Sequence, residues 1–305
     1  MRPSPLIRKF PNMYQKKKSL LADLSIGLIA FIWGTTFTVV KNALTDIGPF
    51  TFLFLRFAIA AIIILPLILQ NTRWKNLPFK AGCMAGFFLF VGFSAQTIGL
   101  QFTTASKSGF ITGLNVVFVP IFVALFEKKR LGKNALLAVL LAVTGLYLLT
   151  NPRAQSFNAG DAWTILCAVG FALHIVTLDY YTRKIDYIGL FFLQIIVVGA
   201  LSGFLIPLEN PGFFSLEYGL PGNVVIALGI TGVFATALAF FIQNWAQRIT
   251  TATRTALLLT LEPVFAALTA YVMLRETLGI MGIIGAALIL LGIITAELRT
   301  KGNSR

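Results

Sequence analysis

The stretch TALLLTLEPVFAALTAYVML, residues 255–274, decides the fold class of this 305-residue chain. Eighteen of its twenty residues are apolar or threonine, and a helix of this length crosses the hydrocarbon core of a bilayer. Glu262 and Pro263 nevertheless lie at its centre. A carboxylate is costly in an apolar medium, and proline cannot donate a backbone hydrogen bond. The stretch therefore predicts a membrane helix whose centre meets a polar environment.

The composition of the whole chain agrees with a bilayer as its solvent. The sequence is 57% hydrophobic and 12% charged, with a mean hydropathy of +0.84, whereas soluble domains are about 25% charged. The net charge of +14 lies mostly in short breaks between apolar runs, which is how membrane topology is encoded. This placement argues against nucleic acid as a partner and leaves lipid as the expected surroundings.

Ten segments are long enough to cross the membrane, and they predict an all-α integral membrane protein. The expected spans are 20–41, 49–70, 80–101, 105–126, 134–150, 161–181, 187–207, 223–246, 252–274 and 278–297. With the N-terminus in the cytoplasm, twenty Lys and Arg fall on the cytoplasmic side and four outside, while Arg56 lies within the second span. This asymmetry predicts a multi-pass protein of the cell (inner) membrane with both termini cytoplasmic.

The chain also contains an internal repeat. At an offset of 147, TTASKSGFITGLNVVF (103–118) aligns with TTATRTALLLTLEPVF (250–265), and at an offset of 138 FLFLRF (52–57) aligns with LFFLQI (190–195). The predicted halves are 20–150 and 161–297, joined by an external linker 151–160 and flanked by cytoplasmic tails 1–19 and 298–305. Because five spans is an odd number, the second half must be inverted in the membrane, which places a substrate site between the halves.

The repeat and its motifs resemble the EamA-type family of the drug/metabolite transporter superfamily. The resemblance is carried by LEPVFAALTAYVMLRETLGIMGIIGAALILLG near the end, by FVPIFVALFEKKRLGKNALLAVLLAVTG in the first half, and by FIWGTTFTVVK and FLRFAIAA in the first two spans. It implies ten helices in two inverted repeats and proton-linked or facilitated exchange and export of small metabolites. It also implies a central cavity between spans 1, 3, 4, 6, 8 and 9, with spans 5 and 10 outside.

The central candidate for function is Glu262. Near the midplane it is expected to bind a proton or a cationic group in a wet cavity, and Pro263 would free the carbonyl of Leu259 for another partner. The alternative is a structural hydrogen bond between helices. The position that matches Glu262 in the first half is Asn115, which is uncharged, so the charge belongs to one half only.

Three further candidates lie on the first and sixth spans. His174 is the only histidine and titrates near neutrality, so it is a candidate for proton coupling or simply a hydrogen-bonded interior residue. Its repeat equivalent is Thr36, one turn from Trp33. Trp33 is expected either to stack on a substrate ring or to fill the core.

Arg56 is expected to anchor an anion or pair with Glu262, or else to extend to the surface or pair with Asp46. Gln96 and Gln243, which are repeat equivalents, are candidate gate residues or ordinary interface amides. Thr112 and Asn115 offer a hydroxyl and an amide to a substrate, although such groups also join membrane helices to one another.

The sequence contains no GxxxxGK[ST], HExxH or GxSxG motif, so neither direct ATP use nor an enzyme is expected, and no cofactor or metal. The chain is thus predicted to be a secondary transporter that moves a small amino-acid-like or amphipathic metabolite by alternating access, with export as the expected direction. A channel-like or facilitative permease, or a receptor without ion coupling, is the alternative. Protons are a candidate coupling ion, and the oligomeric state is left open.

Overall fold

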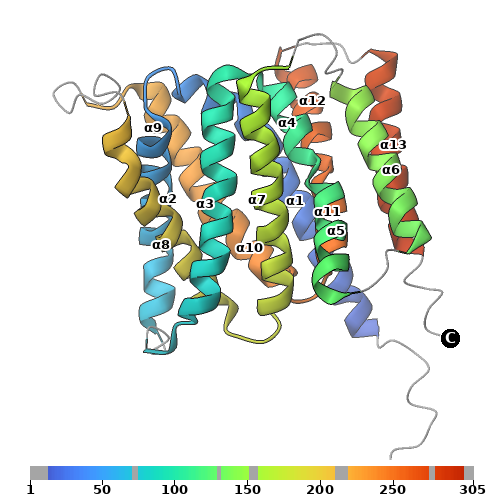
Figure 1. Ribbon diagram of the computed structural model, residues 1–305, viewed down its shortest axis with the longest axis horizontal. Coiled ribbons are helices and arrows are strands. Elements are labelled where there is room, and N and C mark those ends of the chain that lie inside the picture. The colour runs from blue at the N-terminus through green and yellow to red at the C-terminus, as the bar shows by residue number, and fades with distance from the viewer. Residues whose placement is uncertain are drawn as a thin grey trace, which may run out of the picture.

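The computed structural model describes residues 13–70, 75–128, 132–150, 157–209, 219–274 and 279–298, and every regular element in these ranges is helical (Figure 1). In order these elements are α1 (Met13–Ala43), α2 (Pro49–Leu69), α3 (Phe79–Phe102), α4 (Ala105–Gly113), α5 (Asn115–Glu127), α6 (Lys133–Thr150), α7 (Ala159–Tyr181), α8 (Tyr187–Leu205), η4 (Ile206–Leu208), α9 (Gly222–Gly229), η7 (Ile230–Leu238), α10 (Ala239–Ala246), α11 (Ala252–Leu259), α12 (Leu261–Leu274) and α13 (Ile280–Leu298). The tail 1–12, most of the predicted linker and the tail 299–305 lie outside the described residues.

Seven helical stretches in the described part are long and apolar enough to cross a membrane. They are Lys17–Ala43, Pro49–Leu69, Phe79–Phe102, Ala105–Phe126, Ala159–Tyr181, Tyr187–Leu208 and Gly222–Ala246. The other three predicted spans correspond to α6 and α13, whose apolar stretches are shorter, and to α11 with α12. The helical class is therefore as predicted, whereas the count of ten spans stays a prediction.

Three of the spans change their helical geometry midway. The fourth is divided at Leu114 into α4 and α5, and the ninth is divided at Thr260 into α11 and α12. The division in the ninth span lies directly after Leu259, the residue whose carbonyl Pro263 was expected to leave without a helical donor. Pro263 lies in the first turn of α12, where a backbone N–H has no partner within the helix in any case. The eighth span contains a nine-residue π-helix, η7.

We call the end of the bundle at which α1 begins and α13 ends the terminal face, and the other end the opposite face (Figure 1). At the opposite face α1 ends and α7 begins, and both are linked to the end of α3. Lys41 of α1 donates to the carbonyls of Leu100 and Thr103, and the Thr103 hydroxyl donates to Asp161 in the first turn of α7. The first helix of each half thus starts at a different face.

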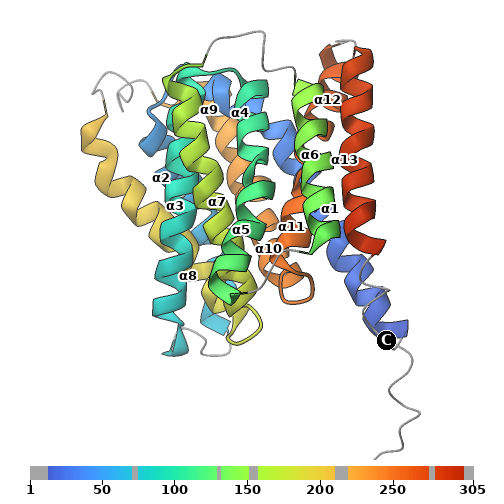
Figure 2. The same cartoon turned by 45° about the vertical axis from the view of Figure 1, so that its right-hand side comes forward.

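Glycines bring the two halves into backbone contact along α3 and α7. A Cβ atom on Gly160 would lie 2.6 Å from the carbonyl oxygen of Gly99, and one on Gly170 would lie 2.7 Å from the nitrogen of Gly92. Helices α6 and α13 form a separate close pair at the side of the bundle, where a Cβ on Gly285 would lie 2.6 Å from the oxygen of Gly145 (Figure 2). This arrangement leaves the remaining helices to enclose the centre.

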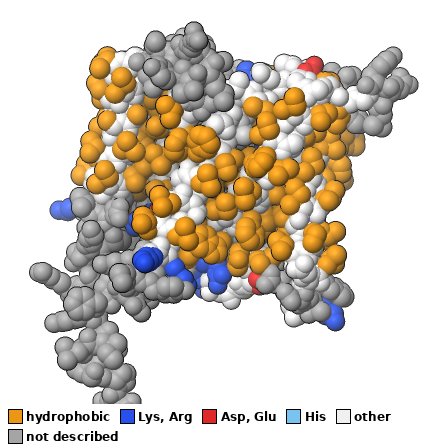
Figure 3. All heavy atoms as spheres, turned by 180° about the vertical axis from the view of Figure 1, so that it is seen from behind, with side chains coloured by type: hydrophobic (Ala, Val, Ile, Leu, Met, Phe, Trp, Pro, Cys, Tyr) orange, Lys and Arg blue, Asp and Glu red, His pale blue; other side chains and the backbone are white. Residues whose placement is uncertain are grey.

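The flank of the bundle presents apolar side chains to its surroundings. Figure 3 shows a broad hydrophobic band on the face it displays, with basic side chains gathered along the lower edge, at the terminal face. Exposed apolar residues on the flank include Ile62, Phe87, Leu140, Ile226 and Leu290. A surface this apolar belongs in lipid rather than in water.

Candidate functional site

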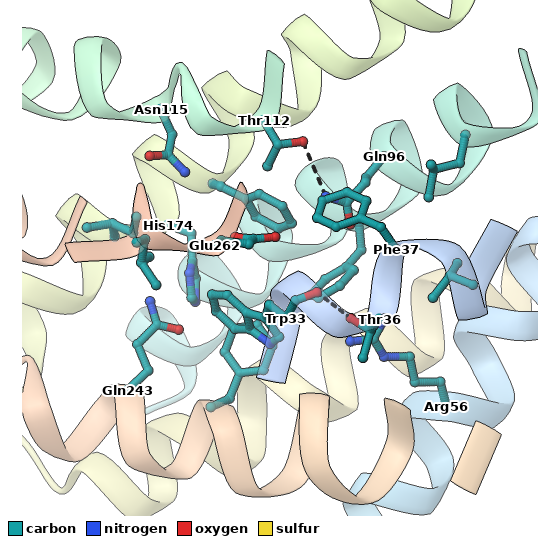
Figure 4. Close-up of a pocket in the computed structure, with 17 residues that line it drawn as sticks. Trp33, Thr36, Phe37, Arg56, Gln96, Thr112, Asn115, His174, Gln243 and Glu262 are labelled. Atoms are coloured by element: carbon teal, nitrogen blue, oxygen red, sulfur yellow. Dashed lines mark hydrogen bonds between the residues drawn. The ribbon is translucent and has the colours of Figure 1, made fainter. Parts of the chain in front are cut away.

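A cavity lies between the two halves at the middle of the bundle (Figure 4). It has a volume of about 620 Å³ when the space that opens to solvent is included. Its lining residues are Trp33, Thr36, Phe37, Val40, Arg56, Phe93, Gln96, Leu100, Thr112, Asn115, Phe171, His174, Ile175, Phe240, Gln243, Leu259 and Glu262. Every candidate residue predicted from the sequence lines this cavity except Pro263, which follows the lining residue Glu262. The structure thus brings these residues together, and their roles in transport remain predictions.

The cavity follows the repeat. At the offset of 138, three lining residues of α1 match three of α7, and at the offset of 147, four of α3, α4 and α5 match four of α10, α11 and α12. The matched pairs are Trp33 and Phe171, Thr36 and His174, Phe37 and Ile175, Phe93 and Phe240, Gln96 and Gln243, Thr112 and Leu259, and Asn115 and Glu262. Because most of the lining is paired in this way, the cavity lies where the two halves meet.

Three lining residues have no equivalent in the wall. Val40, Arg56 and Leu100 line the cavity, and all three belong to the first half. The equivalents of Val40 and Leu100, which are Leu178 and Gln247, are fully buried towards the terminal face. The cavity therefore extends further towards the opposite face than towards the terminal face.

Glu262 is held in the wall by a close contact between backbones. A Cβ atom on Gly34 of α1 would lie only 2.4 Å from the carbonyl oxygen of Glu262, so α1 and α12 touch at this point. The Glu262 carboxylate lies near the centre of the cavity in Figure 4. Among the described residues it has no hydrogen bond or ion pair, so the structural bond between helices that the sequence left open is not formed here. The carboxylate is available to a ligand.

Arg56 takes neither of the partners considered from the sequence. Its side chain is 4% exposed, so it does not extend to the surface, and Asp46 bonds to Thr45 and Asn223 instead. The Arg56 Nε donates to the Thr236 hydroxyl at 2.6 Å, and one terminal nitrogen lies 3.4 Å from the Ala235 carbonyl oxygen. The expected surface position and the pairing with Asp46 were therefore wrong, because the polar groups of η7 hold the guanidinium inside.

His174 is buried and hydrogen-bonded. Its Nε2 lies 2.6 Å from Oε1 of Gln194 on α8, and its ring lies 5.8 Å from that of Phe240. Trp33 is fixed in a similar way, since its indole Nε1 donates to the carbonyl of Ala235 at 2.9 Å and its ring lies 5.2 Å from Phe240. Both side chains line the cavity, and the indole N–H of Trp33 and Nε2 of His174 are already bonded to protein.

The amides of the wall are only partly satisfied. Gln96 donates to the hydroxyl of Thr112 at 3.3 Å, whereas Oδ1 of Asn115 and Oε1 of Gln243 are buried without a hydrogen-bond partner in the described part of the chain. Buried acceptors without a donor are unfavourable, so these two oxygens favour a ligand or water that donates to them.

Aromatic residues of the wall were missed by the sequence analysis. Phe93 lies 5.2 Å from Phe171 and 5.8 Å from Phe240, and these rings form one connected cluster with Trp33. The internal repeat could have identified two of them, because the offset of 147 aligns Phe93 with Phe240. Faces of aromatic rings near a carboxylate suit a ligand that carries a cation on an apolar body.

Two ion pairs bridge the halves, one at each face. Lys107 at the start of α4 bonds Asp161 in α7 at 2.5 Å, with side-chain exposures of 9% and 0%. Arg254 at the start of α11 bonds Asp23 in α1 at 2.5 Å, with exposures of 24% and 10%. The offsets place Lys107 on Arg254 and Asp23 on Asp161. These are therefore equivalent contacts on opposite faces, and the sequence analysis did not predict them.

The helix caps next to these ion pairs repeat as well. The Thr104 hydroxyl accepts from the backbone N–H of Lys107 at 3.2 Å, and that of Thr251 accepts from Arg254 at 3.3 Å. The residues before the two caps differ. The Thr103 hydroxyl donates to Asp161 at 2.8 Å, whereas Oγ1 of its equivalent Thr250 has no hydrogen-bond partner among the described residues. The pair at the opposite face thus has a hydroxyl donor from Thr103 that Thr250 does not supply to the other pair.

Comparison with known proteins agrees with this architecture. The EamA-like transporter family matches residues 20–151 and again residues 158–297. An "Uncharacterized transporter" of Archaeoglobus fulgidus is 38% identical over 282 residues, which span 92% of this chain and 87% of that protein. An "S-adenosylmethionine uptake transporter" of Rickettsia bellii is 25% identical over 240 residues, covering 76% and 78% of the two chains.

A crystal structure with 20% sequence identity superposes with a TM-score of 0.75 and covers 92% of this chain and 97% of that chain, which shows a shared fold. The family match, the apolar helices and the names of the relatives indicate a membrane transporter rather than an enzyme. The chain belongs to the EamA-like transporter family and is a multi-pass membrane protein in which the family unit occurs twice.

Proposed function

We propose that this protein is a secondary transporter that moves a small amphipathic metabolite through the central cavity by alternating access. The observation that carries the proposal is the pair of equivalent ion pairs, Lys107 with Asp161 and Asp23 with Arg254, on opposite faces of one cavity. Each pair joins one half to the other. Opening a face requires its ion pair to separate, while the other pair keeps the second face closed.

Alternating access is favoured over a channel for this reason. A pore without gating needs no contact between the halves at both ends, and a receptor does not need equivalent closures on opposite faces. Two further bonds at the terminal face lie within the second half: Gln247 donates to the carbonyl of Ile175 at 3.0 Å, and Arg183 donates to that of Thr250 at 2.6 Å. They hold parts of that half to one another and do not join it to the first half.

Glu262 is the proposed coupling residue. It is the carboxylate of the cavity wall and has no partner in the described part of the chain, so it can hold either a proton or a cationic group of the substrate. If both compete for one carboxylate, release of the proton on one side permits binding of the substrate. That competition is the simplest way for a proton gradient to drive transport. In this proposal the terminal face is cytoplasmic, the membrane is the inner membrane, and the direction is export.

The name of one relative suggests the first substrate to test. S-adenosylmethionine carries a sulfonium cation, an aromatic base and an amino-acid end, which suit Glu262, the aromatic cluster and the polar wall. The test uses the purified protein in liposomes preloaded with unlabelled S-adenosylmethionine and a parallel panel of amino acids. Alternating access predicts that internal substrate accelerates the entry of labelled substrate. Entry of every solute that is independent of internal substrate contradicts it and favours a channel-like pore.

The decisive variant is Glu262→Gln, which keeps the size and most of the hydrogen-bonding capacity of the side chain. We expect it to lose proton-driven transport while expression and thermal stability in detergent stay close to those of the wild type. The matched control is Asn115→Gln, which changes the equivalent position without altering charge. Full proton-driven transport by Glu262→Gln would limit Glu262 to a structural role.

A further inference from the structure

We propose that Arg56 forms an anion subsite in the cavity, so that the transported substrate carries a carboxylate or phosphate group in addition to the cationic group that meets Glu262. This inference rests on the proposed function, because it assigns a substrate class to the same cavity. It makes the substrate a zwitterion rather than a simple cation. The evidence is the environment of the guanidinium, its available donors, and the residue at the equivalent position of the other half.

The first observation is a buried positive charge with neutral partners only. Arginine stays charged in proteins, and Arg56 is 4% exposed. Its partners in the described part of the chain are the Thr236 hydroxyl, the Ala235 carbonyl and the faces of Phe93 and Phe57, at 4.6 and 5.9 Å from its central carbon. No carboxylate there pairs with it. A buried charge without a counter-ion is unfavourable, so an anion that enters the cavity gains from meeting it.

The second observation concerns the donors that remain. A guanidinium has five N–H donors in a planar fork that matches the two oxygens of a carboxylate or phosphate. Two of them are directed to η7, and Arg56 lines the cavity. Figure 4 shows the Arg56 side chain beside Thr36, in the wall of the same cavity as Trp33 and Glu262. A substrate with opposite charges at its two ends can therefore contact both residues within one cavity.

The third observation separates this role from a purely structural one. The equivalent of Arg56 in the second half is Gln194, which joins α8 to α7 through His174. A neutral amide is thus enough to join helices at this position of the fold. The charge of Arg56 is not required for that contact. The π-helix η7 has an α-helical equivalent in α3 of the first half, and it supplies the Ala235 and Thr236 groups that hold Arg56 in place.

The experiment compares ligands that keep or lack the anionic group or the cationic group. The full chain in detergent is tested by thermal shift and by equilibrium binding with S-adenosylmethionine against decarboxylated S-adenosylmethionine. A second set consists of phenylalanine, 2-phenylethylamine and 3-phenylpropanoate, and inorganic phosphate is tested alone. The variants are Arg56→Gln and Arg56→Lys, with Arg248→Gln as the control, because Arg248 is exposed and packs on Tyr187 outside the cavity.

We expect the wild type and Arg248→Gln to bind at least one carboxylate-bearing compound more tightly than its decarboxylated analogue. Loss of a charged hydrogen bond corresponds to an affinity loss of about 10-fold to 100-fold, and Arg56→Gln should lose that preference. Arg56→Lys should retain part of the preference for carboxylate-bearing compounds. Because it keeps the positive charge, it provides the test if Arg56→Gln does not fold. A carboxylate preference that survives in Arg56→Gln overturns the subsite, and so does a panel without any such preference in the wild type.

Failure of the subsite and failure of the proposed function give different results. Suppose that solutes exchange across the liposome membrane and that Arg56→Gln leaves the preference for carboxylate-bearing solutes unchanged. This result supports the proposed transport function and contradicts the anion subsite. If the carboxylate preference depends on Arg56 but internal substrate never accelerates the entry of labelled substrate, the result supports the anion subsite and contradicts alternating access.

Discussion

The two contacts between the halves are equivalent in sequence but unequal in closeness. On one side α3 meets α7 through Gly92, Gly99, Gly160 and Gly170, whose backbones touch. At the equivalent positions the contact of α1 with α10 has alanine or isoleucine, at Ala239, Ala246, Ala22 and Ile32. Side chains there keep the backbones apart, and a repeated fold thus provides one tight contact and one looser contact between its halves.

The ion pair beside the tight contact is also more buried than the ion pair beside the looser contact. Lys107 and Asp161 accompany the tight contact and are almost fully buried, with the Thr103 hydroxyl as a further donor. Arg254 and Asp23 accompany the looser contact and are more exposed, and the hydroxyl of Thr250 has no partner in the described part of the chain. The comparison indicates that the closure at the opposite face is the stronger one. Transport between two faces then depends on two barriers of different height.

The largest expected effect tests the two ion pairs directly. Asp161→Asn should lower the free energy of unfolding by about 3–5 kcal/mol, because it removes one partner of a buried ion pair. Asp23→Asn should cost about 1 kcal/mol or less, because its pair is partly exposed and screened by solvent. Thermal unfolding in detergent ranks the two variants. The double variants Lys107→Met/Asp161→Asn and Asp23→Asn/Arg254→Met supply the coupling energies. A larger effect at Asp23 would reverse the order of the two closures.

An intermediate effect is expected from the glycine contact. Gly160→Ala should destabilise the protein by about 1–3 kcal/mol, because the added methyl group overlaps the backbone of Gly99. The matched change on the other side is Ala22→Gly, which removes the equivalent methyl group from α1. We expect it to cost about 1 kcal/mol through its effect on the helix alone. Equal tolerance of both changes in thermal unfolding would show that the two contacts are equally close.

The smallest expected effect concerns His174 and its partner Gln194, which is the repeat equivalent of Arg56. His174→Gln should lower stability by about 1 kcal/mol, because it disturbs one buried hydrogen bond with Gln194. Transport and its dependence on a proton gradient should remain close to those of the wild type, since Glu262 is the proposed coupling residue. The measurement is exchange in liposomes with and without a gradient. Loss of gradient dependence in His174→Gln would transfer coupling to the histidine.

Much of the cavity was predictable because the repeat carries information across the chain. The offsets of 138 and 147 brought Trp33, Thr36, Asn115, Gln243 and Glu262 into one hypothesis before any contact was known. Periodic apolar runs reflect the requirement that a backbone in lipid satisfies its own hydrogen bonds, so the helical class follows from composition. The aromatic members of the wall were missed because phenylalanine is common throughout the apolar runs and does not stand out.

The sequence by itself determined the membrane class, the helices, the family and the duplicated unit, since each depends on hydropathy or on similarity along the chain. Only the tertiary structure decided which groups pair. Arg56 bonds to η7 rather than to Asp46, the eighth span contains a π-helix, and Asp161 meets Lys107 across the two halves. The physical reason is that a side chain chooses among partners by distance and burial, and helices far apart in sequence set both.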